Sequence, residues 1–411
     1  MNLKVICLMT SVRGGSKLLQ SLLDDHPQII HFPRTFLLIP FLKKVEDFQE
    51  DPKRISDTFI SDYERFFSGK VWSKYNRLDK ADRLGPNGDE SFEIDTNLFR
   101  SHFIDIYTQE KTEKHSKRLF LSLHYSFQKA KEGFIPDSPI ILYHIHDITF
   151  VEDLALCVND FGIDNVKVLF TTRHPIDGLN ATFNTYLFQN RLSPLFWYIR
   201  EVFAFNSNLV SSFPGLKIKI VLLELMKSFR KEMMLGIHKW CDLSWNDSLL
   251  KSTLMGKEWK GNAQKPKGDI QYKFVWFSPV GFFEKKDTMI FNTLFPSRMK
   301  LFGNSYQRRC RNKLLLSILV LMPLKIEVSF AIKSLSLIYW GTAFTNIWEK
   351  VGEQDSSNLL TKRICACSLA FWQGNILQGI RFYIKRVKLS FSYLVNQPKL
   401  EKYDLVWGPN E

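Results

Sequence analysis

Apolar runs of strand length alternate with helix-spaced apolar positions in the first part of the chain, up to residue 245. The runs occupy residues 3–9, 140–146, 166–172 and 216–223. Such runs are typical of strands in a parallel sheet, and each is shorter than the roughly 20 residues that span a membrane. Leucines at positions 18, 19, 22 and 23 follow helical spacing, and further helices are predicted over 148–160 and 226–240. The alternation predicts an α/β fold: a doubly wound parallel sheet flanked by helices.

The connection from the first predicted strand to the first helix carries an anion-binding pattern. Residues 13–17 read Arg-Gly-Gly-Ser-Lys. Glycines let backbone N–H groups turn towards a phosphate, and the helix N-terminus adds a favourable dipole. Arg13, Ser16 and Lys17 add side-chain donors. The loop is neither a Walker A element, since Lys17 follows Ser16, nor a Rossmann fingerprint, since Gly14 and Gly15 adjoin. It predicts a phosphate site, with an ordinary strand-to-helix turn as the structural alternative.

Charge and cysteine usage narrow the class of protein. The net charge of +14 and the pI near 9.3 indicate an anionic partner, without choosing between nucleotide, nucleic acid, acidic glycan and membrane surface. Cys7 and Cys157 lie in apolar periodic segments and are predicted to be buried thiols. Cys365 and Cys367 lack a second ligand pair, so no metal is expected. The scattered cysteines and the absence of a signal-peptide pattern favour a cytoplasmic protein.

The loop and its flanks resemble the 5′-phosphosulfate loop of sulfotransferases that use 3′-phosphoadenosine 5′-phosphosulfate (PAPS). In that family a strand is followed by Arg or Lys, Ser-Gly-Thr/Ser-Thr, Leu-Leu and often His-Pro. The matching positions are Arg13, Gly15, Ser16, Leu18, Leu19, His26 and Pro27. Gly14 and Lys17 depart from the pattern, where Ser and Thr are usual. The motif style is closest to that of bacterial members.

Two later segments resemble the same family in the same order. Arg173, Pro175 and Asp177 match the segment in which an Arg grips the 3′-phosphate. The usual Ser of that segment falls on Ala181, and the adjacent Thr182 is the alternative hydroxyl. Residues 252–262 resemble the late segment that closes over the nucleotide. Its predicted nucleotide-binding residues are Trp259, Lys260, Gly261 and Asn262.

The resemblance implies a PAPS-dependent sulfotransferase (EC 2.8.2 type) on a P-loop-NTPase-like sheet. Sulfonate would move by in-line displacement to a hydroxyl or an amine, with Arg13 and Lys17 stabilising the leaving PAP. No metal is expected, because these cations supply the charge. His146 is the preferred base, then His144, then His31, and a purely structural role stays open for each. Two-residue spacing predicts that His144 and His146 share one face of a strand.

The resemblance also implies that the loop binds the nucleotide. The predicted nucleotide-binding residues, besides those of the late segment, are Arg13, Gly14, Gly15, Ser16, Lys17, Leu18, Arg173, Ala181 and Thr182. The acceptor is expected to be a small metabolite, a saccharide or a lipid, and nucleic acid is not expected as a partner. The oligomeric state is left open.

The predicted domains are a sulfotransferase domain over 1–300, with a helical and loop insertion on the acceptor side over about 35–135, and a helical C-terminal extension over 301–411. Residues 381–388 mix aromatic and basic side chains at helical spacing. A helix packed on the core is the first interpretation, and peripheral membrane contact is the second. Two other functions stay open: a nucleotide-dependent kinase or phosphotransferase, and a non-catalytic protein that binds membranes or nucleic acid.

Overall fold

The computed structural model describes residues 3–261 except 12, 74–78, 148–150, 175, 176 and 179–212, together with residues 318, 321, 383, 384, 387 and 388. The chain divides into two compact units. One consists of Met1–Arg173, Asn208–Phe274 and Lys402–Glu411, and the other of His174–Ser207 and Val275–Glu401. The strands and helices below belong to the first unit. The predicted boundary at residue 300 and most of the predicted extension lie outside the described residues. No helix in the described ranges is long and apolar enough to span a membrane.

The centre of the first unit is a five-stranded sheet in the order β2-β3-β1-β4-β5, and all of its pairings are parallel. Its strands are β1 Lys4–Thr10, β2 Ile29–Ile30, β3 Ile140–Asp147, β4 Val166–Thr172 and β5 Lys217–Leu222. The four predicted strands are thus confirmed to within about two residues, and β2 is a short edge strand that the pattern did not predict. Because the strands are parallel, their carboxyl ends meet at one edge.

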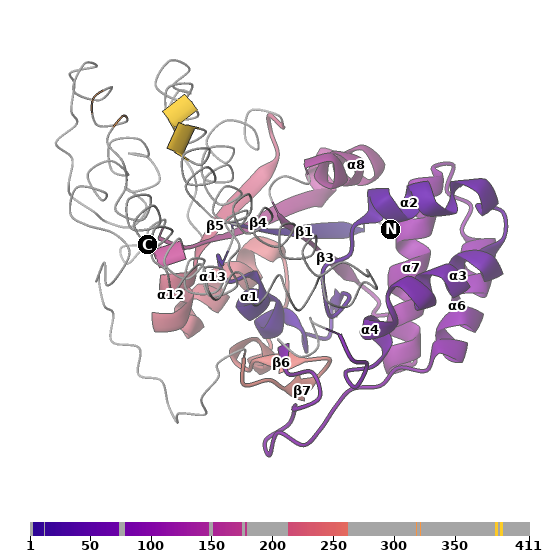
Figure 1. The fold of residues 1–411 in the computed structure, drawn as a ribbon, viewed down its shortest axis with the longest axis horizontal. Helices are drawn as coiled ribbons and strands as arrows, with labels where there is room; N and C mark the ends of the chain where they lie inside the picture. Colours follow the sequence, from indigo (N-terminus) through magenta and orange to yellow (C-terminus); the bar gives the residue numbers. More distant parts are fainter. Residues whose placement is uncertain are drawn as a thin grey trace, which may run out of the picture. The chain divides into compact units, whose positions relative to one another are not determined.

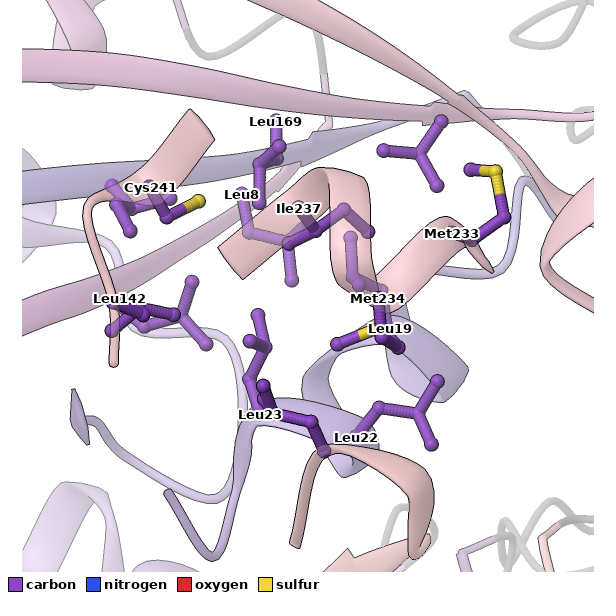
Figure 2. Packing of buried hydrophobic residues seen from close by; sticks show 14 of the residues in the cluster. Leu8, Leu19, Leu22, Leu23, Leu142, Leu169, Met233, Met234, Ile237 and Cys241 are labelled. Atoms are coloured by element: carbon purple, nitrogen blue, oxygen red, sulfur yellow. The ribbon is translucent and has the colours of Figure 1, made fainter. Parts of the chain in front are cut away.

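One face of the sheet is covered by α1 Ser16–Leu23, α12 Leu223–Ser228 and α13 Arg230–Cys241 (Figure 1). Figure 2 shows Leu8, Leu142 and Leu169 of three neighbouring strands packed against Leu19 and Ile237 of these helices. The helix predicted over 226–240 is wrong in one respect: it is two helices, because Phe229 leaves helical geometry at φ −134°. The helix-spaced leucines of α1 are buried against this face of the sheet.

The other side of the sheet is contacted by α8 Val151–Phe161, which follows β3 and leads through a 3₁₀ turn, η2 Ile163–Asn165, into β4. Cys157 on α8 and Cys7 on β1 are both buried, free thiols, as predicted. Residue 148 begins the gap before α8, so the start of the predicted 148–160 helix lies outside the described residues. Helices on both faces make the sheet doubly wound.

The predicted insertion over about 35–135 is helical, beyond the β3 end of the sheet (Figure 1). It contains α2 Leu38–Val45, η1 Glu46–Phe48, α3 Pro52–Asp62, α4 Glu64–Phe67, α6 Thr96–Gln109 and α7 His115–Glu132. Its core is aromatic: Phe59, for example, packs against Phe99 with ring centroids 5.5 Å apart. A chain of such ring contacts connects α2, α3, α4, α6 and α7.

A small hairpin follows α13. After η4 Asp247–Leu250, strands β6 Thr253–Leu254 and β7 Lys257–Glu258 pair antiparallel across Met255 and Gly256. Both turn residues have positive φ, 55° and 75°. This hairpin lies within the predicted nucleotide-closing segment 252–262 and packs beside α1.

Candidate functional site

The loop between β1 and α1 needs glycine at both of its glycine positions, for different reasons. Gly15 caps α1 with φ 95°, and a Cβ there would lie 2.5 Å from Leu223 Cδ1. A Cβ at Gly14 would lie 2.6 Å from the Thr171 carbonyl oxygen and 2.8 Å from that of Ser11. Since backbone atoms cannot move aside, the Ser that is usual in the resembled pattern does not fit at Gly14 here. The first departure from that pattern is therefore enforced by the fold.

The loop is joined to the end of β4 by hydrogen bonds. The Ser11 N–H donates to the Thr171 carbonyl at 3.1 Å, and the Ser11 and Thr172 hydroxyls lie 3.2 Å apart. The Thr171 hydroxyl donates to Thr10 Oγ1 at 2.8 Å. We call these hydrogen bonds the seam between the loop and β4. Because residue 173 directly follows β4, the seam holds the start of the Arg173 segment beside the loop at the carboxyl edge of the sheet.

The N-terminus of α1 has the polarity that an anion requires. Its first turn contains no acidic residue, and its N-cap is a glycine that makes no side-chain cap bond. The first N–H groups of a helix have no acceptor within the helix, and they carry part of the positive end of its dipole. Ser16 is buried at this turn, Leu18 is half-buried, and Arg13 is exposed with φ 61°.

Lys17 is engaged with the insertion. Its Nζ lies 3.0 Å from Asp79 Oδ2, and the same carboxylate oxygen accepts a hydrogen bond from Arg34 Nη1. Burial lowers the pKa of Lys17, and the charge of Asp79 opposes that shift. A cavity of about 10 Å³ lies between Lys17, Gln20, Asp79 and Trp259, which is room for one water molecule. The second departure from the resembled pattern is thus a lysine paired with a carboxylate.

Arg173 directly follows β4 and is half-buried, with Nε 3.7 Å from Glu224 Oε1 in the first turn of α12. The guanidinium therefore has an acidic neighbour at the edge where the resemblance predicts the 3′-phosphate. Ala181, Thr182 and Asn262 lie outside the described residues, so their predicted roles stay predictions. His174 is buried and belongs to the second unit.

The hairpin segment is anchored on α1 and on the insertion. Asp24 Oδ1 and Oδ2 accept from the N–H groups of Met255 and Gly256 at 2.9 and 2.8 Å. Trp259 is buried and its Nε1 donates to the Asp79 carbonyl at 2.7 Å, while Lys260 Nζ donates to the Pro86 carbonyl. Gly261 ends the described segment with φ 74°, and among the described residues no atom lies within 4 Å of where its Cβ would be.

Of the three candidate bases, His144 and His31 have described contacts, whereas the side chain of His146 lies outside the described residues. His144 continues the apolar face of β3 that contains Ile140 and Leu142, and it is 3% exposed with Nδ1 3.0 Å from Gln20 Oε1. The register slips between its pairing with Leu8 and the next one, because Met9 pairs with His146. The regular alternation that predicted one shared face for the two histidines is therefore interrupted between them.

His31 is buried in a separate pair. Its Nε2 lies 3.0 Å from Asp24 Oδ1, and its Nδ1 lies 2.8 Å from the Phe32 carbonyl. Burial acts to raise the pKa of Asp24, but the His31 hydrogen bond and charge outweigh it and lower that pKa to about 2. His31 therefore helps to hold in place the Asp24 carboxylate that binds the turn of the hairpin.

Several site neighbours have no sequence signal that separates them from surface charges. Asp79 stands outside any motif, and both Asp79 and Glu224 meet their cations only through the fold. Gln20 has a weak signal, since it is a polar residue among the helix-spaced leucines of α1. In the described ranges, no group of three or more His, Cys, Asp or Glu side chains has the arrangement of a metal site.

No family model and no curated protein matches this chain. Among solved structures, it is similar to the sulfotransferase domain from the olefin synthase of Synechococcus PCC 7002, at 11% identity and a TM-score of 0.34, over 61% of this chain and 78% of that one. It is also similar to the sulfotransferase domain from the curacin biosynthetic pathway, at 14% identity and a TM-score of 0.35, over 61% of this chain and 77% of that one. Likenesses this weak carry no argument about activity, which must come from the residues of the site.

Proposed function

We propose that this protein transfers the sulfonate group of PAPS to a hydroxyl, or an amine, of an acceptor molecule. The seam between Ser11 and Thr171 carries the proposal, because it holds the Arg13 loop and the Arg173 segment at one edge of the sheet. A 3′-phosphorylated nucleotide has two separate anionic groups, and an arginine suits each because its planar fork can bind a phosphate through two hydrogen bonds.

The residues of the loop fit such a ligand. The first turn of α1 contains no acid that would repel an anion, and the N–H groups of that turn have no acceptor within the helix. In the proposed assignment, the loop from Arg13 to Leu18 binds the 5′-phosphosulfate, and Arg173 binds the 3′-phosphate. The segment from Trp259 to Asn262 covers the nucleotide.

The proposed chemistry needs a base and a cation. PAPS supplies an activated sulfonate: the acceptor oxygen bonds to sulfur as the bond from sulfur to the phosphate oxygen breaks. His144 or His146 takes the proton of the acceptor, while Arg13 balances the negative charge that stays on the phosphate. The Asp79 carboxylate and the sulfonate are both anionic. If the Lys17 ammonium leaves Asp79 and binds the sulfonate, it stabilises the reaction together with Arg13.

Calorimetric titration with PAP, ATP and a short DNA duplex tests the donor. We expect micromolar PAP binding that weakens at least tenfold in Arg173→Ala, because a hydrogen bond to a charged group contributes about 1.5–3 kcal/mol. Arg100→Ala is the matched control: this arginine is also partly exposed and paired with one carboxylate, that of Asp57, but it lies on α6. Preference for ATP or DNA, or equal losses in the two variants, would refute the assignment.

Radiolabelled PAPS offered with pools of glycans, lipids and small alcohols tests the transfer itself. Arg13→Ala is expected to abolish labelling while the circular dichroism spectrum and the unfolding midpoint stay those of the wild type, because Arg13 is exposed. Full turnover by this variant would remove Arg13 from the mechanism.

A further inference from the structure

A glutamine is buried on the flank of α1 that lines the small cavity beside Lys17. Gln20 is 4% exposed and lies beside Leu19, Leu22 and Leu23, which pack under the sheet. A buried amide without hydrogen bonds costs free energy, so its contacts need an account. Gln20 Nε2 lies 2.7 Å from the Phe32 carbonyl oxygen, and Gln20 Oε1 lies 3.0 Å from His144 Nδ1.

The Phe32 carbonyl decides which way the amide points. A carbonyl oxygen only accepts, so the NH₂ group of Gln20 must face it, and the opposite orientation would place two oxygens 2.7 Å apart. The Gln20 oxygen is then the atom that faces His144. The same carbonyl lies 2.8 Å from His31 Nδ1, whose ring is held on its other side by Asp24. The orientation of the amide therefore rests on buried backbone and a buried ion pair.

The amide orientation in turn decides the tautomer of His144. The Gln20 oxygen accepts, so His144 Nδ1 carries the hydrogen and donates it. In the neutral ring the lone pair is then on Nε2, because the hydrogen bond that one ring nitrogen makes sets the state of the other. The lone pair on Nε2 is the one that a base needs in order to accept a proton.

We propose that Gln20 is a positioning residue, which holds His144 in the Nδ1–H tautomer and makes Nε2 its basic atom. The proposal rests on the proposed function, since it gives His144 the role of base in sulfonate transfer. It selects His144 over His31, both of whose ring nitrogens face oxygen acceptors, the Asp24 carboxylate and the Phe32 carbonyl.

The tautomer is measured directly by ¹⁵N–¹H correlation spectra of histidine-labelled protein without any ligand, with His144→Gln to assign the signals. The wild type is expected to show a protonated Nδ1 and an unprotonated Nε2. Gln20→Met keeps the length of the side chain but removes the acceptor, so we expect the ring to shift towards the Nε2–H form.

Gln128→Met is the matched control, because Gln128 is a buried glutamine that lies on α7. It is expected to leave the His144 signals unchanged. An Nε2–H ring in the wild type, or an unchanged ring in Gln20→Met, would overturn the assignment.

Kinetics separate positioning from mere folding. With PAPS and water as the acceptor, Gln20→Met is expected to lose at least tenfold in kcat, while the KM for PAPS and the dissociation constant of PAP stay within twofold of the wild type. A shifted tautomer with unchanged kcat would overturn the positioning role. If the wild type neither binds PAP nor turns over PAPS, the proposed function fails, and the spectra still decide the tautomer assignment by themselves.

Discussion

Replacing Gly15 by alanine perturbs the anion-binding loop in two separable ways. A side chain at φ 95° costs about 1–2 kcal/mol, because a Cβ is strained in the left-handed region. The new Cβ would also lie 2.5 Å from Leu223 Cδ1 and 3.2 Å from its Cγ, and overpacking of this kind costs a further 1–3 kcal/mol or so. We therefore expect Gly15→Ala to lower the free energy of unfolding by about 2–5 kcal/mol.

Gly133 provides the matched control. It has φ 81° at the C-terminus of α7, and a Cβ there would meet nothing within 4 Å. Gly133→Ala therefore isolates the backbone strain, and a loss of about 1–2 kcal/mol is expected. Leu223→Ala in the Gly15→Ala background removes the overlapping atoms, so the double mutant is expected to recover about 1–3 kcal/mol relative to additive losses.

Urea unfolding measures these free energies, and PAP titration measures the loop itself. Equal losses in Gly15→Ala and Gly133→Ala, or strict additivity with Leu223→Ala, would refute the argument that the close approach of α12 requires glycine. PAP binding is expected to weaken in Gly15→Ala and to remain unchanged in Gly133→Ala.

Three further predictions concern charge. Burial lowers the pKa of His124 to about 3. As the pH falls below about 6.5, this histidine is therefore protonated in the unfolded chain before it is protonated in the folded one. The free energy of unfolding is expected to fall by about 1.4 kcal/mol per pH unit between about pH 6.5 and pH 3. His124→Phe is expected to reduce that slope by one proton in urea unfolding, and an unchanged slope would contradict the shift. Glu224→Gln removes the carboxylate beside Arg173 and is expected to tighten PAP binding several-fold in calorimetry, whereas weaker binding would show that the carboxylate positions the guanidinium. Asp79→Asn leaves Lys17 and buried Arg34 without their shared carboxylate, so a loss of about 3–5 kcal/mol is expected, and a loss below about 1 kcal/mol would contradict the pairing.

The sequence predicts the sheet because the signal is local. Four of the five strands follow runs rich in apolar residues, and the helix-spaced leucines of α1 are buried beneath that sheet. The loop was recognisable for the same reason, since its glycines, serine and cations are adjacent in the chain. The register slip before His146 arises in the pairing of β3 with β1, which is distant in sequence. The break at Phe229 has no proline or glycine beside it that would predict it.

The sequence alone determines the order of strands and helices along the chain and the residue types of the anion-binding loop. Hydrophobic periodicity and the backbone freedom of glycine act over a few residues, so both can be read locally. Only the tertiary structure decided which charged and polar groups meet. Asp79 comes to Lys17 from 62 residues away, Ser11 meets Thr171 across 160 positions, and Gln20 reaches His144 across 124. The Ser11 and His144 contacts depend on how the parallel strands line up within the sheet, and the Asp79 contact depends on how the insertion packs beside α1.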